Sequence, residues 1–282
     1  MFNLAVVICS GFFHALWNVV SKHSRHKLAF FLCIQCMALV IFFPYVAMNL
    51  SPIVWNTTTY ILIPSMMFFH ALYFVFLARA YSLSDVSTVY PIVRGSMSLM
   101  LPIVGVFFLG EHITVMGWVG IAAIIIGIVL LSESAWSVSG LKKMITGHTG
   151  IALLVAVCSA ANIMIDKFAI SFFPIITVNW IGTLGNCVVL LLFIWDKETV
   201  RLEWQRNKGW IWISAILAPV SYLMFLWAIQ SAQIAQLAPI REIGSVFAVG
   251  LGIAFLGEKN GRHRLIASLI VTAGIILLGL NR

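Results

Sequence analysis

The stretch YPIVRGSMSLMLPIVGVFFLGE, from Tyr90 to Glu111, occurs in a second form as APIREIGSVFAVGLGIAFLGE, from Ala238 to Glu258. Each copy has a proline at its start and an arginine two or three residues later, continues through apolar and small residues, and closes on Phe-Leu-Gly-Glu. An arginine at the centre of a membrane-spanning helix costs about 2.5–3.5 kcal/mol on insertion scales. A duplicated segment that keeps this cost predicts two helices that line a polar path for a small solute.

The composition places the chain in a membrane. Hydrophobic residues make up 62% of the chain and charged residues 9%, and the mean hydropathy is +1.05. A soluble domain carries about a quarter charged residues, so this chain has too few to cover a solvated surface. The net charge of +8 comes mostly from residues in short loops. Such loops orient helices against lipid, so we expect no binding to nucleic acid.

Ten apolar segments, separated by short polar ones, predict an all-α polytopic membrane protein with ten transmembrane helices. The polar segment 196–208 carries the most charge, and we expect it to be a loop. The predicted spans are residues 2–21, 28–48, 60–80, 86–109, 115–131, 150–170, 174–195, 209–229, 234–256 and 265–280.

The two halves of the chain resemble each other beyond the opening motif. Ser10 and Asn18 in the first span have counterparts in Ser159 and Asn162 of the sixth. Residues 1–133 and 149–282 are therefore interpreted as two five-helix repeats, joined by a linker at 134–148. An odd number of spans gives the repeats opposite orientations, as in many secondary transporters whose substrate binds near the membrane midplane between the repeats.

The distribution of lysine and arginine predicts the orientation. If the loop between the first two spans is inside, the inside loops hold thirteen Lys or Arg residues, and the outside segments hold only Lys167 and Arg282. The positive-inside rule therefore predicts that both termini lie outside the cell membrane.

The repeated elements resemble the EamA-type drug/metabolite transporter (DMT) superfamily. The resemblance covers nearly the whole chain and rests on a proline, a closing Gly-Glu and a later glycine in each half, which are Pro91, Glu111 and Gly127, then Pro239, Glu258 and Gly274. It implies ten helices around a central cavity in the cytoplasmic (inner) membrane. It also implies alternating access without nucleotide hydrolysis and without a cofactor. Members carry amino acids, choline-like cations, sugar phosphates, nucleotide sugars and other metabolites, so substrate and direction stay open.

The two arginines are the strongest candidates for solute binding. Arg94 and Arg241 can hold a carboxylate or phosphate with paired hydrogen bonds. The alternative is that they reach the membrane interface or form an ion pair with Glu242. Glu242 is interpreted as the acid well inside a span, either as a counter-charge or as a proton-coupling carboxylate. Pro91 and Pro239 are expected to break or gate their helices.

Polar and aromatic side chains share helix faces with spacings of three and four. We expect them to line the path, although helix–helix hydrogen bonds or anchoring at the lipid headgroups would also explain them. Glu111 and Glu258 are interpreted as structural, and Gly120, Gly127, Gly244 and Gly250 as close-packing positions. The path-lining candidates are His14, Trp17, Asn18, His70, Tyr73, Tyr90 and Trp227.

These features predict a secondary transporter for a small anionic or zwitterionic metabolite, either amino-acid-like or bearing a phosphate or phosphonate. A flippase for a lipid-linked sugar or phosphate and an intramembrane lipid-modifying enzyme are the alternatives. We expect no enzyme and no metal, because the acids other than Glu242, Asp166 among them, are assigned to loops without a convergent catalytic set. Protons are one candidate for a coupled ion, and a monomer and a homodimer both remain open.

Overall fold

The structure is a computed structural model that describes residues 2–21, 24–49, 53–83, 86–130, 138, 139, 142, 149–194, 196–256 and 261–280. This part of the chain is helical and contains no strand. The helices are α1 Phe2–Ser21, α2 Lys27–Met48, α3 Thr57–Leu83, α4 Val86–Leu109, α5 Val115–Leu130, α7 Thr149–Ala169, α8 Ile175–Phe193, α9 Lys197–Gln230, α10 Ile234–Ile240, α11 Ile243–Leu256 and α12 Gly261–Gly279.

Eight helical segments in the described ranges are long and apolar enough to cross a membrane, with α10 and the start of α11 counted as one segment. The helix α5 and residues 266–279 of α12 are apolar but shorter. Helices are the expected solution, because a spanning segment must satisfy its backbone N–H and C=O groups internally where no water is present. The predicted all-helical membrane class is therefore confirmed.

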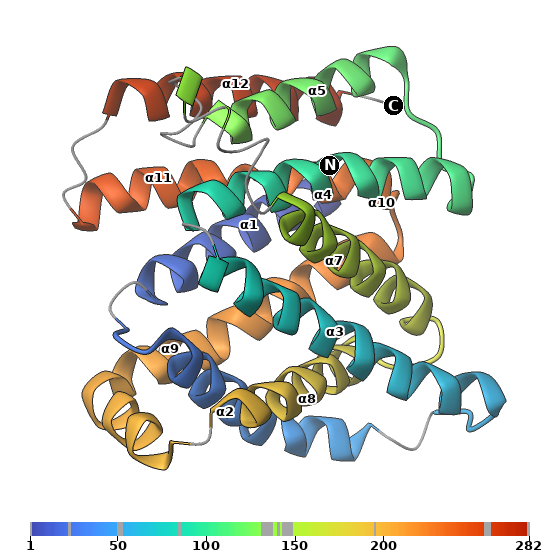
Figure 1. The fold of residues 1–282 in the computed structure, drawn as a ribbon. Coiled ribbons are helices and arrows are strands. Elements are labelled where there is room, and N and C mark those ends of the chain that lie inside the picture. Colours follow the sequence, from blue (N-terminus) through green and yellow to red (C-terminus); the bar gives the residue numbers. More distant parts are fainter. Residues whose placement is uncertain are drawn as a thin grey trace.

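The helices are arranged in layers (Figure 1). The helices α5 and α12 lie side by side, with α4 and α11 next to them. On the other side of that layer α1 packs on α9, α3 on α7, and α2 on α8. The crossing of α5 and α12 depends on Gly120 and Gly274, since a methyl group on either would lie 2.6–2.7 Å from the carbonyl oxygen of the other.

The charged segment after α8 is helical, so the loop predicted at 196–208 is wrong. The Asp196 carboxylate accepts hydrogen bonds from the Glu198 N–H at 3.0 Å and from the Thr199 hydroxyl, which starts α9. Val200 and Trp204 pack against the core beside α2, so this helix has an apolar face that its charge content conceals. A kink at Asn207, with φ −119° and ψ 21°, separates this first part from the apolar rest of α9.

The span predicted at 234–256 is broken. Helix α10 ends at Ile240 and α11 begins at Ile243, and the turn between them is closed by short bonds from the Glu242 N–H to the Pro239 carbonyl and from the Ser245 N–H to the Glu242 carbonyl. Pro239 has no N–H to continue the α-helical ladder. The proline therefore removes one bond from the last turn of α10, and the helix ends one residue after it, at Ile240.

The corresponding break expected at Pro91 is absent, because α4 continues through this residue. The side chains of Tyr90 and Pro91 lie outside the described residues, and so does Glu258. The close packing expected at Gly250 is also not seen, since no atom in the described chain lies within 4 Å of a methyl group placed there.

The glycine contact between α5 and α12 leads to a stability prediction. Gly120→Ala should lower the free energy of unfolding by about 1–3 kcal/mol, because the added methyl group pushes two backbones apart. Gly209→Ala is the matched control, since nothing lies within 4 Å of its methyl group. Thermal unfolding in detergent measures both variants, and equal stabilities would contradict the close crossing.

Candidate functional site

The turn between α10 and α11 brings two charged residues into the interior of the bundle. Arg241 and Glu242 form this turn, and α1 lies directly against it. A methyl group on Gly11 of α1 would lie 2.9 Å from the Arg241 carbonyl oxygen and 3.1 Å from the Gly244 nitrogen. The absence of a side chain at Gly11 therefore allows α1 to cover the broken turn.

Arg94, on α4, is held by partners from both halves of the chain. Its Nη1 donates to Glu242 Oε1 at 3.2 Å, and its Nη2 donates to His14 Nε2 on α1. The side chains of Arg94 and Glu242 are 17% and 7% exposed. The ion pair considered as an alternative for the arginines is thus present for Arg94.

Arg241 has a different environment. Its Nε donates to the Ser10 hydroxyl at 3.2 Å and its Nη2 to the Ser221 hydroxyl at 3.4 Å. Its guanidinium carbon lies 4.5 Å from the ring centroid of Phe225 and 5.5 Å from that of Tyr222, within the range of cation–π attraction. In the described chain Arg241 forms no ion pair, so its charge is held by hydroxyls and aromatic rings.

The two serines that hold Arg241 also fasten α1 to α9. Ser10 Oγ donates to the Ser221 carbonyl at 2.6 Å, and Ser221 Oγ donates to the Ser10 carbonyl at 2.9 Å. This reciprocal contact holds the two hydroxyl oxygens in place. Both remain able to accept a hydrogen bond from the guanidinium, because a hydroxyl is a donor and an acceptor at the same time.

Asp166 is the main functional candidate that the sequence interpretation missed. It was assigned to a loop, but it lies within α7, and its side chain is fully buried. Its Oδ2 accepts a hydrogen bond from the Tyr222 hydroxyl at 2.6 Å and lies 3.1 Å from His70 Nε2. The interpretation that Glu242 is the one acid deep in a span is therefore wrong. The sequence does contain a signal for this position. Asp166 lies four residues after Asn162, on the same face of a helix, in an apolar segment that continues to Ile170.

The imidazole of His70 packs directly on the backbone of α8. A methyl group on Gly182 would lie 2.7–2.9 Å from three atoms of the ring. Gly182 therefore leaves the space in which the ring of His70 reaches Asp166.

Lys167 has a structural contact, although it was counted as part of an outside segment. Its ammonium group donates to the Ile229 carbonyl and, at 3.0 Å, to the Ala232 carbonyl. These carbonyls lie at the C-terminal end of α9, where helix carbonyls lack intrahelical partners. Lys167 thus caps α9 from α7.

Glu111 caps a helix of the other half of the chain, not the helix that follows it. Its two carboxylate oxygens accept the N–H groups of Ile234 at 2.9 Å and Ala235 at 2.7 Å, at the start of α10. Gly110 turns the chain with φ +65°, which favours glycine. A methyl group on Gly105 would lie 2.5 Å from Glu111 Oε2, so glycine is needed there too. The repeated Gly-Glu motif is therefore structural in its first copy.

The remaining candidates divide between two places. The ring of Trp17 packs edge-on against His14 at 5.5 Å, and Asn18 donates to the His14 carbonyl at 2.7 Å. Tyr73 lies on α3 three residues after His70 and packs against the core. Trp227 lines a separate pocket near the start of α1.

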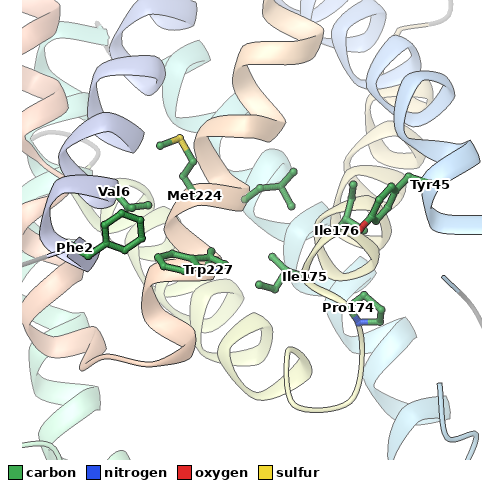
Figure 2. Close-up of a pocket in the computed structure, with 9 residues that line it drawn as sticks. Phe2, Val6, Tyr45, Pro174, Ile175, Ile176, Met224 and Trp227 are labelled. Carbon is green, nitrogen blue, oxygen red and sulfur yellow. The ribbon is translucent and has the colours of Figure 1, made fainter. Parts of the chain in front are cut away.

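Figure 2 shows this pocket, which has a volume of about 560 Å³. It lies between α1 and α9 on one side and α2 and the start of α8 on the other, and it is lined by apolar and aromatic side chains apart from the Tyr45 hydroxyl. Its lining residues are Phe2, Val6, Tyr45, Pro174, Ile175, Ile176, Leu223, Met224 and Trp227.

The Arg94–Glu242 contact predicts a non-additive mutant cycle. Arg94→Ala and Glu242→Ala should each lower the free energy of unfolding by about 3–5 kcal/mol, because each leaves an uncompensated charge in the interior. The double variant should lose less than the sum, with a coupling of about 0.5–3 kcal/mol. The matched cycle of Arg241→Ala with Glu242→Ala should show a smaller coupling. Thermal or denaturant unfolding in detergent measures both cycles, and a larger coupling for Arg241 would contradict the observed pairing.

Comparisons with known proteins agree with this architecture. The model of the EamA-like transporter family matches residues 1–133 and 149–280. An uncharacterized protein of Methanocaldococcus jannaschii is 26% identical over 134 residues, which cover 46% of this chain and 95% of that protein.

Two further relatives are named as transporters. The uncharacterized transporter YojE of Bacillus subtilis is 30% identical over 95 residues, which cover 32% of each protein. An uncharacterized transporter of a Sinorhizobium species is 43% identical over 104 residues, which cover 34% of this chain and 74% of that protein. A solved crystal structure has the same fold, with a TM-score of 0.69, 15% identity and coverage of 99% of this chain and 96% of its own. The chain belongs to the EamA-like transporter family and is a multi-pass membrane transporter of the DMT superfamily.

Proposed function

We propose that this protein is a secondary transporter that moves a small anionic or zwitterionic metabolite across the cytoplasmic membrane by alternating access. The observation that carries the proposal is the charge of Arg241, which lies in the interior without a carboxylate partner in the described chain. A charge without a counter-charge is costly inside a membrane protein and marks a functional site. A carboxylate, phosphate or phosphonate on the solute would supply that counter-charge.

The hydrogen-bonding capacity of Arg241 supports this interpretation. A guanidinium group has five N–H donors in a planar fork. The two serine hydroxyls occupy two of them in the described structure, on Nε and Nη2. The remaining donors suit the paired oxygens of a carboxylate or phosphate.

The neighbouring Arg94–Glu242 pair is close to neutral, so the local excess of charge belongs to Arg241. Arg94 and Arg241 lie close enough to interact electrostatically, and His14 is near both. We assign Arg94, Glu242 and His14 to the side of the binding site opposite the serines. In the same proposal Trp17, Asn18, His70, Tyr73, Tyr90 and Trp227 shape the path, and Pro239 gates it through the helix break.

The pattern of helix packing supports ten spans in two inverted repeats. Exchanging α1 with α7, α2 with α8, α3 with α9, α4 with α10 and α11, and α5 with α12 converts each main contact into another observed one. The α1–α9 contact becomes α7–α3, and α1–α11 becomes α7–α4. The half-length relative from Methanocaldococcus jannaschii fits a repeat of five helices. In transporters of this plan, broken helices at the repeat interface form the substrate site.

The count of basic residues supports an orientation with both termini outside. Thirteen Lys or Arg residues lie in the inside loops, against Lys167 and Arg282 outside. Lys167 caps the C-terminal end of α9, which lies on the outside in this orientation. A bias of this size is typical of the positive-inside rule.

A labelling experiment tests the orientation. Arg201 lies on the charged first part of α9, and its side chain is 69% exposed. A cysteine in the variant Arg201→Cys should react with a membrane-impermeant maleimide only after the cells are permeabilised, with the wild-type cysteines as background. Labelling in intact cells would reverse the proposed orientation.

A flippase for an amphipathic anion is the second candidate, and the apolar pocket favours it. A pocket of about 560 Å³ lined by side chains such as Phe2, Met224 and Trp227 suits an acyl or prenyl chain better than a polar solute. The anionic head group would still bind at Arg241. Transfer of a fluorescent lipid phosphate between leaflets would favour the flippase, and accumulation of a water-soluble solute would favour the carrier.

A variant of Arg241 tests the proposed solute site. A thermal-shift screen of the purified protein against carboxylates, amino acids, organic phosphates and phosphonates identifies the solute, and uptake is then measured in proteoliposomes. Arg241→Ala should reduce uptake about 10- to 100-fold, because a hydrogen bond to a charged group contributes about 1.5–3 kcal/mol. Arg241→Lys should recover only part of the activity, because lysine lacks the planar fork.

The matched control is Arg201→Ala, which removes an exposed arginine of α9 and should leave uptake unchanged. Folding is checked by elution as a single species and by thermal unfolding. Wild-type uptake by a folded Arg241→Ala protein would refute the anion site.

A further inference from the structure

The carboxylate of Asp166 is completely buried, and its polar contacts all lie on one of its two oxygens. Oδ2 receives the Tyr222 hydroxyl and lies within hydrogen-bond distance of His70 Nε2. Oδ1 is buried and has no hydrogen-bond partner in the described chain. One oxygen of the carboxylate therefore has two polar partners, and the other oxygen has none in the described chain.

An ionised carboxylate with an unpartnered oxygen is unfavourable in a membrane interior. Burial without a hydrogen bond costs a polar group several kcal/mol, and a charged group more. A proton on Oδ1 removes the charge and leaves both contacts at Oδ2 intact. We propose that Asp166 Oδ1 is the proton-binding site that couples transport to the proton gradient, an inference that rests on the proposed carrier function and extends it.

The groups around Asp166 come from α3, α8 and α9, which pack against α7. Helix α8 contributes the backbone of Gly182, on which the ring of His70 rests. Lys167, the next residue on α7, is directed away to the carbonyls at the end of α9. Of the charged and titratable groups, His70 of α3 and Tyr222 of α9 contact Asp166, and Tyr222 in turn lies beside Arg241 of the α10–α11 turn. Helix α4 also packs against α7, and its charged residue is Arg94, which contacts Glu242 and His14.

Tyr222 links the proton site to the proposed anion site. Its hydroxyl binds Asp166, and its ring lies under the guanidinium of Arg241, 5.5 Å from the guanidinium carbon. While Asp166 is ionised, its negative charge offsets the positive charge of Arg241 across this ring. Once Asp166 is protonated, the described chain offers Arg241 no other negative charge nearby except Glu242, which is already paired with Arg94. Protonation therefore favours the binding of an anion.

Coupling of this kind is reciprocal, so an anion on Arg241 raises the affinity of Asp166 for the proton. The proton is taken from water on the side to which the site is open, adds to a lone pair of Oδ1, and returns to water on the other side. One proton crosses with one negative charge of the solute, and the charge of the loaded site equals that of the empty site. The empty and fully loaded forms are then the ones able to change conformation at low cost.

Infrared difference spectroscopy detects the proton directly. The wild-type protein, reconstituted in lipid without any solute, is titrated from about pH 8 to about pH 4. A protonated carboxylic acid has a carbonyl stretching band that an ionised carboxylate lacks. Exposed carboxyl groups also take up protons near pH 4, so the test concerns one component of this band. We expect a component in the wild type that Asp166→Asn lacks and that remains in the matched control Glu242→Gln, in which the other buried acid of the site is removed.

A second variant covers the case in which Asp166→Asn does not fold. Asp166→Glu keeps a carboxyl group in a different position, so the band should remain with a shifted frequency. The assignment would be overturned if the component kept its frequency in Asp166→Glu, persisted in folded Asp166→Asn, or was lost in Glu242→Gln. A wild-type spectrum identical to that of Asp166→Asn would also overturn it.

Transport measurements separate this inference from the proposed function. With a solute identified by the thermal-shift screen, Asp166→Asn should keep solute exchange within about twofold of the wild type but lose accumulation driven by an imposed proton gradient. Accumulation that persists in this variant would refute proton coupling through Asp166 but would not contradict the proposed anion carrier. If no anionic solute binds but the infrared assignment holds, the carrier proposal fails and the proton site remains.

Discussion

The positive charge of Arg241 is the constraint on which the rest of the structure depends. A guanidinium group inside a membrane bundle must be given polar partners or lie near water, because the hydrocarbon around the bundle provides neither. Two serine hydroxyls and two aromatic rings surround it, and these come from α1 and α9. The reciprocal bonds between Ser10 and Ser221 hold this arrangement together. This contact between α1 and α9 therefore holds a charge that no carboxylate of the described chain pairs with.

The broken helix that presents Arg241 is stabilised from outside its own repeat. Pro239 removes a donor from the helical ladder, Gly11 of α1 provides space for the turn, and Glu111 of the first half caps the start of α10. The contacts of Gly11 and Glu111 join the first half of the chain to the second. A movement of one half against the other would therefore act directly on the turn that carries Arg241 and Glu242. This is the physical link between a helix break and alternating access in the proposed mechanism.

The duplicated motif was a good guide to the fold because its signal is local. Apolar runs of about 20 residues and repeated Pro, Arg and Gly-Glu positions can be found along the chain. They predicted the helix that carries Arg94 correctly, whereas the span predicted around Arg241 is broken at that residue. The same reasoning predicted Asp166 in a loop because its side chain is charged, although it lies in α7. It also mistook the first part of α9 for a loop, although Val200 and Trp204 give it an apolar face. The partners of Asp166 lie far away in the sequence, and so do the α2 residues beside which Val200 and Trp204 pack.

The sequence by itself determined the membrane class, the family resemblance and the two arginines as candidates, because composition, span length and repeated motifs are properties of neighbouring residues. Only the tertiary structure decided which partner each charge has. Arg94 is neutralised by Glu242, 148 positions later, Arg241 is left with hydroxyls and rings, and Asp166 is placed beside His70 and Tyr222. The physical reason is that a buried charge takes its energy from atoms within a few ångströms. In this bundle those atoms belong to helices that are brought together by packing, and the spacing of residues along the chain does not predict which helices meet.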